Sequence, residues 1–399
     1  MTDKKLRTGL ILLIGSLGLF QPLSVDPYMP NISNIARDLN VEAALIGQNL
    51  TLLTLGVSIG LLVAGPLSDA VGRRKPVLFA VAGYAFTSIA TIFVSNFETF
   101  FALRAFQGFF AACAAVVANA MLRDLYKGLQ LIKAIARSML LMGTAWFLGP
   151  VFGSVLQSFT NWRGLGGILA SIAVLLLILV FFKLPDTMSF EDRTKTSTKE
   201  VAKGFLRLLK DRVFLGLVLI QIAISVSLYG YLSLSTFIYS NAYQVLPTQV
   251  GFCLAINSLC SYTGAQLGAA LSRKFKPQYV LLGTLVLGIS AGLGLVLSAI
   301  AHWPFVVFSV ILALFVMSFG SSITPLLGLA MDSHPYEAGT AAAVVQFAGT
   351  FAATLAGSLY AVLDHDTSLG LGFTIVGFLS LGVIFMFTIV RPNRLELMK

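Results

Sequence analysis

Two charged residues lie inside otherwise apolar segments of the chain. Asp26 comes late in the first apolar run, and Arg104 comes early in a later one. Burying a charge within a membrane is expensive, so an acid or base inside a span is a functional candidate. The two segments run in opposite directions, which brings both residues to a similar depth. We therefore expect Asp26 and Arg104 to pair, because pairing offsets the loss of hydration.

A buried carboxyl group such as that of Asp26 can take up and release a proton. Desolvation and a nearby arginine act in opposite directions on the proton affinity of a carboxyl, so together they can tune it. Two alternatives remain open. Asp26 could cap a helix break at Pro27 and Pro30, and Arg104 could extend its side chain to the membrane interface. We favour proton coupling by Asp26 and Arg104, with the proton as coupling ion and no other cofactor.

Transmembrane helices must position these residues. Of the 399 residues, 57% are hydrophobic and 11% are charged, whereas a soluble domain has about 25% charged residues. A helix needs about 20 apolar residues to cross a bilayer, and an open sheet edge cannot cross. We predict an all-α integral membrane protein of twelve such helices. Their centres lie near Leu19, Thr54, Thr87, Phe110, Ala145, Ala173, Ser225, Leu259, Leu287, Leu314, Thr350 and Gly377.

One long polar stretch divides the twelve segments into two sets of six. We predict an N-terminal six-helix bundle over 1–184, a central loop over 185–212 and a C-terminal six-helix bundle over 213–399. A weak repeat relates the halves, because the stretches that begin at Gly65 and Gly268 both lead into a basic cluster. Repeated halves are common in secondary transporters, which bind substrate between them near mid-membrane.

The distribution of Lys and Arg predicts the topology. If both termini are cytoplasmic, 24 of the 27 Lys and Arg residues lie on the cytoplasmic side, as the positive-inside rule requires. The exceptions are Arg37, Arg104 and Arg163. The same asymmetry explains the formal net charge of +10, so no nucleic-acid partner is needed to account for it. We expect a multi-pass protein in a lipid bilayer with both termini cytoplasmic.

The remaining chemistry-bearing residues do not form a recognisable catalytic or metal-binding set. Cys113, Cys253 and Cys260 are scattered through apolar segments, which argues against a disulfide framework or a metal site. The three histidines lie far apart, and the chain has no GxxxxGK[ST] loop for a nucleotide. We therefore predict that the chain is neither an enzyme nor an ATP-driven transporter.

The loop between the second and third segments has a specific pattern. Gly65-Pro66-Leu67-Ser68-Asp69-Ala70-Val71-Gly72-Arg73-Arg74-Lys75 resembles the signature loop of the major facilitator superfamily, except at Ala70, where a basic residue is common. The resemblance implies a conformational latch in which Asp69 faces the start of the eleventh helix and Arg73 pairs with Asp124. The implied latch residues are Gly65, Asp69, Gly72, Arg73, Arg74 and Asp124. The alternative is simple anchoring of the loop by its positive charges.

Further patterns narrow the resemblance. Arg104-Ala105-Phe106-Gln107-Gly108 is similar to the fourth-helix motif of proton-linked members. The fifth segment resembles the antiporter motif at Gly143, Gly149, Pro150 and Gly153, although helix packing alone would also explain small residues there. Asp26-Pro27-Tyr28-Met29-Pro30 looks like the D-x-Y-x-P element of the Bcr/CflA drug-resistance exporters. Arg123-Asp124-Leu125-Tyr126 and Ala338-Gly339-Thr340-Ala341 also resemble elements of those proteins.

The resemblance implies a function as well as a fold. It implies a monomeric proton-coupled antiporter in a bacterial inner membrane that exports small drug-like molecules, of the chloramphenicol or bicyclomycin type, by alternating access. Such a protein would act in multidrug efflux and antibiotic resistance. The alternative is a proton-coupled or facilitated transporter of a small metabolite. An anionic metabolite would favour more intramembrane Lys or Arg than Arg104 alone.

Polar and aromatic residues within the segments are candidates for the substrate cavity. Such a site needs only a few polar groups on a mostly apolar wall. For each candidate, an interhelical hydrogen bond is an equally good interpretation. The candidates are Gln21, Tyr28, Asn119, Gln221, Tyr229, Asn257, Tyr262 and Gln346.

Overall fold

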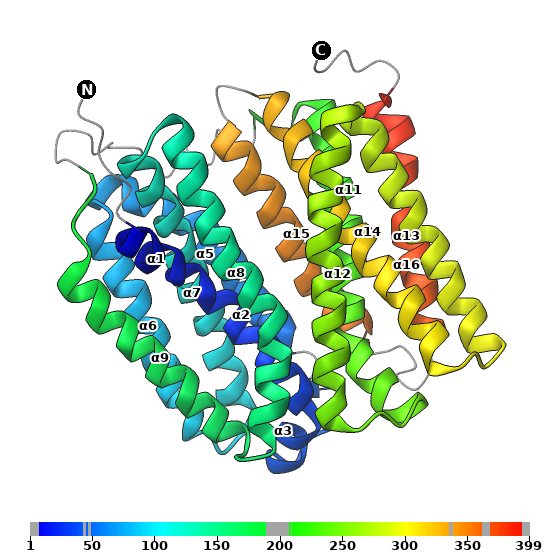
Figure 1. Ribbon diagram of the computed structural model, residues 1–399, viewed down its shortest axis with the longest axis horizontal. Coiled ribbons are helices and arrows are strands. Elements are labelled where there is room, and N and C mark those ends of the chain that lie inside the picture. Colours follow the sequence, from blue (N-terminus) through cyan, green and yellow to red (C-terminus); the bar gives the residue numbers. More distant parts are fainter. Residues whose placement is uncertain are drawn as a thin grey trace. The chain divides into compact units, whose positions relative to one another are not determined.

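The computed structural model describes residues 8–42, 45–46, 49–188, 207–208, 210–334, 338–360 and 368–392. They form helices joined by short connections (Figure 1). The chain divides into two compact units, Met1–Thr198 (unit 1) and Lys199–Lys399 (unit 2). Most of the predicted central loop over 185–212 lies outside the described residues.

Unit 1 contains six long helical segments in its described part, coloured from blue to green in Figure 1. They are the interrupted segment Thr8–Asp38 and the helices α5 (Asn49–Val71), α6 (Arg74–Ile92), α7 (Phe97–Leu125), α8 (Gly128–Gln157) and α9 (Trp162–Lys183). Two asparagine caps set where helices begin. Asn96 and Asn161 each accept a hydrogen bond of 2.9 Å from the backbone N–H three residues later. These caps satisfy donors that the first turns of α7 and α9 would otherwise leave free.

The first segment of unit 1 is broken rather than continuous. It consists of α1 (Thr8–Ser16), the 3₁₀ turn η1 (Leu17–Leu19), α2 (Phe20–Val25), the 3₁₀ turn η2 (Asp26–Asn31) and α3 (Ile32–Asp38). Proline lacks a backbone N–H and its ring collides with the preceding turn. Pro27 and Pro30 therefore prevent a regular α-helix through η2. Asp26 is the first residue of that turn, so the break in the helix carries the acid.

Unit 2 also has six helical segments in its described part. They are α11 (Arg212–Phe237), which continues into the π-helical turn η3 (Ile238–Ala242), α12 (Pro247–Lys274), α13 (Pro277–Ile300), α14 (Phe305–Asp332), α15 (Ala338–Tyr360), and α16 (Ser368–Phe385) with the π-helical turn η5 (Met386–Val390). Asp211 caps α11 by accepting from the N–H groups of Val213 and Phe214. Pro247 and Pro277 begin α12 and α13. Proline suits this position because the N–H groups of a first helical turn have no partner within the helix.

The two units repeat one close helix contact. In unit 1, α5 packs on α7, and a Cβ atom at Gly56 or Gly60 would collide with the backbone carbonyl of Ala105 or Phe109. In unit 2, α12 packs on α14, and Gly264 and Gly268 meet the carbonyls of Met317 and Ser321 in the same way. Small residues allow two helix backbones to approach this closely. In this helix packing Gly268 therefore corresponds to Gly60, whereas a Cβ atom added at Gly65 would meet no atom of another helix within 4 Å.

The prediction of an all-α membrane fold is confirmed. Ten helical segments of the described residues are long and apolar enough to cross a membrane. The helices α12 and α15 complete two sets of six in the same part of the chain. The exposed large apolar side chains of these helices, such as Phe79, Phe86 and Phe182, suit contact with lipid rather than water.

Candidate functional site

Asp26 lies where α8 packs against the broken first segment. Its Oδ2 atom is buried and has no hydrogen-bond partner among the described residues. Gly149 of α8 faces it, because a Cβ atom there would lie 2.8 Å from the Cβ of Asp26. One turn later, Gly153 faces the backbone of Pro27. The two glycines thus let α8 close over η2.

The antiporter-motif residues therefore lie on the helix that packs against the acid. Pro150, like Gly149 and Gly153, is buried, whereas Gly143 is half-buried. Sequence spacing alone did not indicate which side of α8 would face Asp26. In the structure, the glycines at positions 149 and 153 are one helical turn apart and lie on the side that contacts η2.

Arg104 is buried in unit 1, with 1% of its surface exposed. It donates to the backbone carbonyl of Ser24 and to Oε1 of Gln107, the latter at 2.9 Å. Its guanidinium lies over the ring of Tyr28, 4.4 Å from the centroid, which is a cation–π contact. These partners replace the ion pair with Asp26 that we expected. The reason is local, because the broken helix turns the Ser24 carbonyl and the Tyr28 ring toward Arg104.

A second set of hydrogen bonds supports this arrangement. The hydroxyl groups of Ser24 and Tyr84 are 2.8 Å apart, and Tyr84 stacks on Phe20 with ring centroids 4.2 Å apart. Gln107 also donates to Ser88 Oγ at 3.2 Å. The contacts connect α2, α6 and α7. The supporting roles of Ser24 and Tyr84 were missed from sequence, since neither belongs to a charged or glycine-rich motif.

The latch residues meet around Arg73, which follows α5. Arg73 donates to Asp124 Oδ2 at 2.9 Å, to Ser68 Oγ at 2.7 Å and to Asp69. Gly72 has a φ of 91°, a conformation that only glycine adopts readily, and this turn aims Arg73 back at α5 and α7. The structure therefore forms the Arg73–Asp124 contact, and the contact of Asp69 with the eleventh helix stays a prediction.

The residues after α9 extend the latch. The backbone N–H of Arg73 donates to Asp186 Oδ1 at 3.1 Å, and Thr187 Oγ1 donates to Asp124 Oδ2 at 3.1 Å. Arg74 donates to the carbonyl of Phe181 at 2.8 Å. Asp186 and Thr187 belong to the central loop that the sequence predicts over 185–212. No motif marks them, and only the return of the chain past α6 brings them to Arg73.

The neighbouring carboxylates stabilise the charged form of Arg73. Burial alone lowers the pKa of Arg73, but the hydrogen bonds to Asp124 and Asp69 outweigh burial, and the pKa is raised above its usual value. Charged hydrogen bonds of this kind are stronger than neutral ones. The side chain is therefore a permanent cation that joins the loop after α5 to the end of α7.

The residues predicted to line the substrate cavity have different surroundings in the structure. Tyr28 is buried beneath Arg104, and Asn257 is buried and donates to the hydroxyl of Tyr239 at 3.0 Å. Gln221 donates to Ser225 Oγ at 3.0 Å. Gln21 and Tyr229 are half-buried, and the exposed candidates are Asn119, Tyr262 and Gln346. Within the units, then, Tyr28, Gln221 and Asn257 make contacts with protein groups, and their role in a cavity stays a prediction.

Together these features define a class of protein. The chain is an all-helical, multi-pass membrane protein with a buried carboxyl oxygen at a helix break and a cluster of ion pairs around one arginine. The family model described as Major Facilitator Superfamily matches residues 14–357. The chain therefore belongs to the major facilitator superfamily, a family of membrane transport proteins.

Individual proteins are also similar to this chain over most of its length. The chain is 30% identical over 343 residues to an uncharacterized MFS-type transporter, YdgK, of Bacillus subtilis (strain 168), covering 86% of this chain and 85% of that protein. It is 27% identical over 393 residues to a bicyclomycin resistance protein homolog of Haemophilus influenzae, covering 98% and 99%. Among solved structures, a D-xylose-proton symporter superposes with a TM-score of 0.81 at 15% identity, over 99% and 100% of the chains. That likeness concerns the fold.

Proposed function

We propose that the chain is a proton-coupled antiporter that exports small drug-like molecules by alternating access. The main observation behind this proposal is that Oδ2 of Asp26 is buried and has no hydrogen-bond partner among the described residues. The match to a bicyclomycin resistance protein homolog over nearly the whole chain supports the drug-like substrate class.

The surroundings of Asp26 suit an acid that changes its charge. Among the described residues, an ionised carboxylate in this position has no ion-pair partner, because Arg104 is engaged by Ser24, Gln107 and Tyr28. Protonation removes the uncompensated charge, and a change of conformation that admits water or a donor would favour release. In this proposal Asp26 carries the proton, and Arg104 keeps η2 and α2 in place beside it.

The packing of α8 on η2 couples the proton to conformation in this proposal. Gly149 and Gly153 lie directly against Asp26 and Pro27, so a movement of α8 changes the space around the carboxyl group. The Arg73 latch would stabilise one conformation until that movement breaks it. Packed interfaces of this kind are bistable rather than continuously deformable, which is what alternating access requires.

The placement in the cell is part of the proposal. The excess of Lys and Arg in alternate loops supports a bacterial inner-membrane location with both termini cytoplasmic. The Arg73 latch would then lie on the cytoplasmic side. The partners would be a small-molecule substrate and the lipid bilayer.

The test is transport by Asp26→Asn in proteoliposomes. With an imposed proton gradient, the wild type should move chloramphenicol uphill against the direction of proton flow, and Asp26→Asn should not. The matched control is Asp38→Asn in the same broken segment. The Asp38 carboxylate is bonded by Trp162 Nε1 at 3.0 Å and by Arg163. We expect Asp38→Asn to keep gradient-driven transport.

Two results would count against the proposal. Gradient-driven export by Asp26→Asn at the wild-type rate would remove the assigned proton carrier. Uptake of a metabolite in the same direction as the proton, with no transport of drug-like compounds, would instead support the metabolite transporter.

A further inference from the structure

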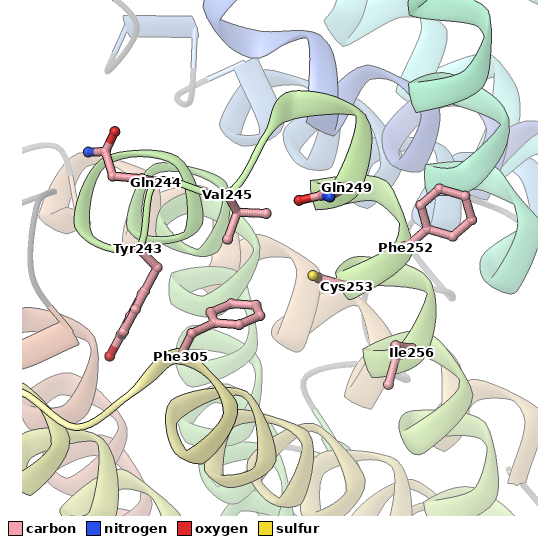
Figure 2. A pocket seen from close by; sticks show the side chains of 8 residues that line it. All are labelled: Tyr243, Gln244, Val245, Gln249, Phe252, Cys253, Ile256 and Phe305. Carbon is pink, nitrogen blue, oxygen red and sulfur yellow. The ribbon is translucent and has the colours of Figure 1, made fainter.

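A pocket lies within unit 2, beside the connection between η3 and α12. Its volume is about 630 Å³, within the range of small-molecule sites. Residues from the connection after η3, the start of α12 and the start of α14 line it (Figure 2). They are Tyr243, Gln244, Val245, Gln249, Phe252, Cys253, Ile256 and Phe305.

Irregular backbone builds one wall of this pocket. The helix α11 ends in the π-helical turn η3, and the backbone N–H of Tyr243 donates to the carbonyl of Ile238 at 3.3 Å. Gln244 then adopts a φ of 53°, which is uncommon for a residue with a side chain. Such conformations and single π-helical turns concentrate at functional sites. Here they turn the chain sharply and bring Val245 to the pocket.

An aromatic cluster makes the wall rigid. Tyr243 stacks on the buried Phe308 with ring centroids 4.8 Å apart, and Phe305 lies against Tyr243 and Tyr239 at 5.6 and 5.8 Å. Figure 2 shows Phe305, Val245, Gln249 and Cys253 directed toward the same space. A preformed aromatic face of this kind can bind a flat apolar group with little loss of side-chain entropy, because its rings are already ordered.

The polar groups define the ligand further. None of the residues that line the pocket carries a charge. The amide of Gln249 can both donate and accept a hydrogen bond, and the thiol of Cys253 is a weak donor. An ionised ligand would lose its hydration without gaining an ion pair. The pocket therefore matches a neutral aromatic molecule with one or two hydrogen-bonding groups.

We propose that this pocket is a second small-molecule site, specific for neutral aromatic compounds and lined by none of the residues assigned to proton coupling. The residues that line it belong to unit 2, whereas Asp26 belongs to unit 1. The site does not depend on proton coupling. Phe305 provides the stacking face, Gln249 the hydrogen bond, and Cys253 reports on occupancy because its thiol lies at the pocket.

Two cysteines on α12 give a matched test. Cys253 lines the pocket, and Cys260, seven residues further along the same helix, does not. One full-length variant, Cys113→Ala with Cys260→Ala, retains only Cys253. The other, Cys113→Ala with Cys253→Ala, retains only Cys260. The rate of alkylation by N-ethylmaleimide is measured for each purified variant, with and without chloramphenicol as the neutral aromatic probe.

The expected result is selective protection. At a chloramphenicol concentration about ten times its dissociation constant, alkylation of Cys253 should slow about tenfold, since only the free fraction reacts. Alkylation of Cys260 should keep its rate, and benzoate, an aromatic anion, should protect neither. Phe305→Ala should abolish the protection of Cys253. Equal slowing of both cysteines, or equal protection of Cys253 by benzoate, would overturn the inference.

If N-ethylmaleimide alkylates Cys253 too slowly to follow, the binding of radiolabelled chloramphenicol is measured directly. Cys253→Phe should fill the pocket and reduce the amount of radiolabelled chloramphenicol bound per chain at saturation, whereas Cys260→Phe should not. Unchanged saturation in both would overturn the inference. Asp26→Asn separates this site from the proposed function. It should leave the protection of Cys253 intact while gradient-driven export is lost. Export by Asp26→Asn with Cys253 still protected would refute only the proposed function, whereas a protein with Asp26 intact that exports chloramphenicol without protection of Cys253 would refute only the pocket.

Discussion

Asp26 and Asp124 are acids of the same unit in opposite surroundings. Asp124 accepts hydrogen bonds from Arg73 at 2.9 Å and from Thr187 at 3.1 Å, whereas Oδ2 of Asp26 has no partner among the described residues. An acid whose charge is balanced holds two segments together. An acid whose charge is not balanced is better suited to a change of charge. Asp124 thus makes a structural contact, whereas Asp26 is the acid that we propose changes its charge.

The two arginines differ in the same way. Arg73 is bonded to the acids Asp69 and Asp124, so its charge is neutralised locally. Arg104 contacts a carbonyl, an amide oxygen and an aromatic ring, all of them neutral. The partners of Arg104 at Ser24 and Tyr28 lie two residues before and two after Asp26. Arg104 therefore fixes the backbone around the acid without bonding the acid itself.

Removing Arg104 should have the largest effect on stability. Arg104→Ala should lower the free energy of unfolding by about 3–5 kcal/mol, because it opens a cavity and leaves buried acceptors without a donor. Denaturant unfolding in detergent measures this loss. The control is Arg163→Ala, whose partly exposed ion pair with Asp38 should be worth no more than about 1 kcal/mol. Similar losses for both variants would contradict the buried role of Arg104.

Filling the contact between α8 and η2 should have the next largest effect. In Gly153→Ala the new Cβ would collide with the carbonyl of Pro27, and such overpacking costs about 1–3 kcal/mol. We also expect slower transport, measured in proteoliposomes. Gly65→Ala is the control, because nothing lies within 4 Å of the new atom. It should raise stability by about 0.5–1 kcal/mol through better helix propensity. A stable, fully active Gly153→Ala would show that this contact is not needed.

Loss of the latch cation should cost less, because its carboxylate partners are partly exposed. We expect Arg73→Gln to lower the free energy of unfolding by about 1–2 kcal/mol, and Arg74→Gln to lower it less. The raised pKa of Arg73 means that its stabilisation is lost only as pH rises through that pKa. The difference between wild type and Arg73→Gln should therefore stay constant from about pH 7 to 9. A difference that fades over this range would contradict the permanent charge.

The smallest expected effect concerns the residues after α9. Asp186→Ala removes the acceptor for the backbone N–H of Arg73 and should lower the free energy of unfolding by about 0.5–1.5 kcal/mol. Asp186→Asn retains an acceptor oxygen and should lose less. Equal losses in thermal unfolding would indicate that charge, rather than this hydrogen bond, ties the segment to the latch.

Much of the architecture was predictable from composition and spacing. Each apolar segment must satisfy its own backbone in a membrane, so length and hydropathy are enough to indicate a helix. The break at Asp26 was visible in Pro27 and Pro30, and the latch was visible in the pattern from Gly65 to Lys75. These features are local, because a proline or a positive φ acts on its own turn.

The partners of the charged groups were not predictable in the same way. Equal depth suggested an ion pair between Asp26 and Arg104, but the guanidinium turns to Ser24, Gln107 and Tyr28. Sequence position gives only the depth of a side chain in the membrane, whereas an ion pair also depends on which way each helix faces. The recruitment of Asp186 to Arg73 depends likewise on where α9 returns.

The sequence alone determined that this chain is a helical membrane protein of the major facilitator type, with one acid at a proline break and a cationic loop. Only the tertiary structure decided that Oδ2 of this acid has no hydrogen-bond partner in the described part of the chain, that α8 presents Gly149 to the acid, and that uncharged residues line a pocket in unit 2. The physical reason is that helix formation depends on neighbours in sequence. The pairing of a buried charge depends instead on the rotation of each helix about its axis, which packing sets.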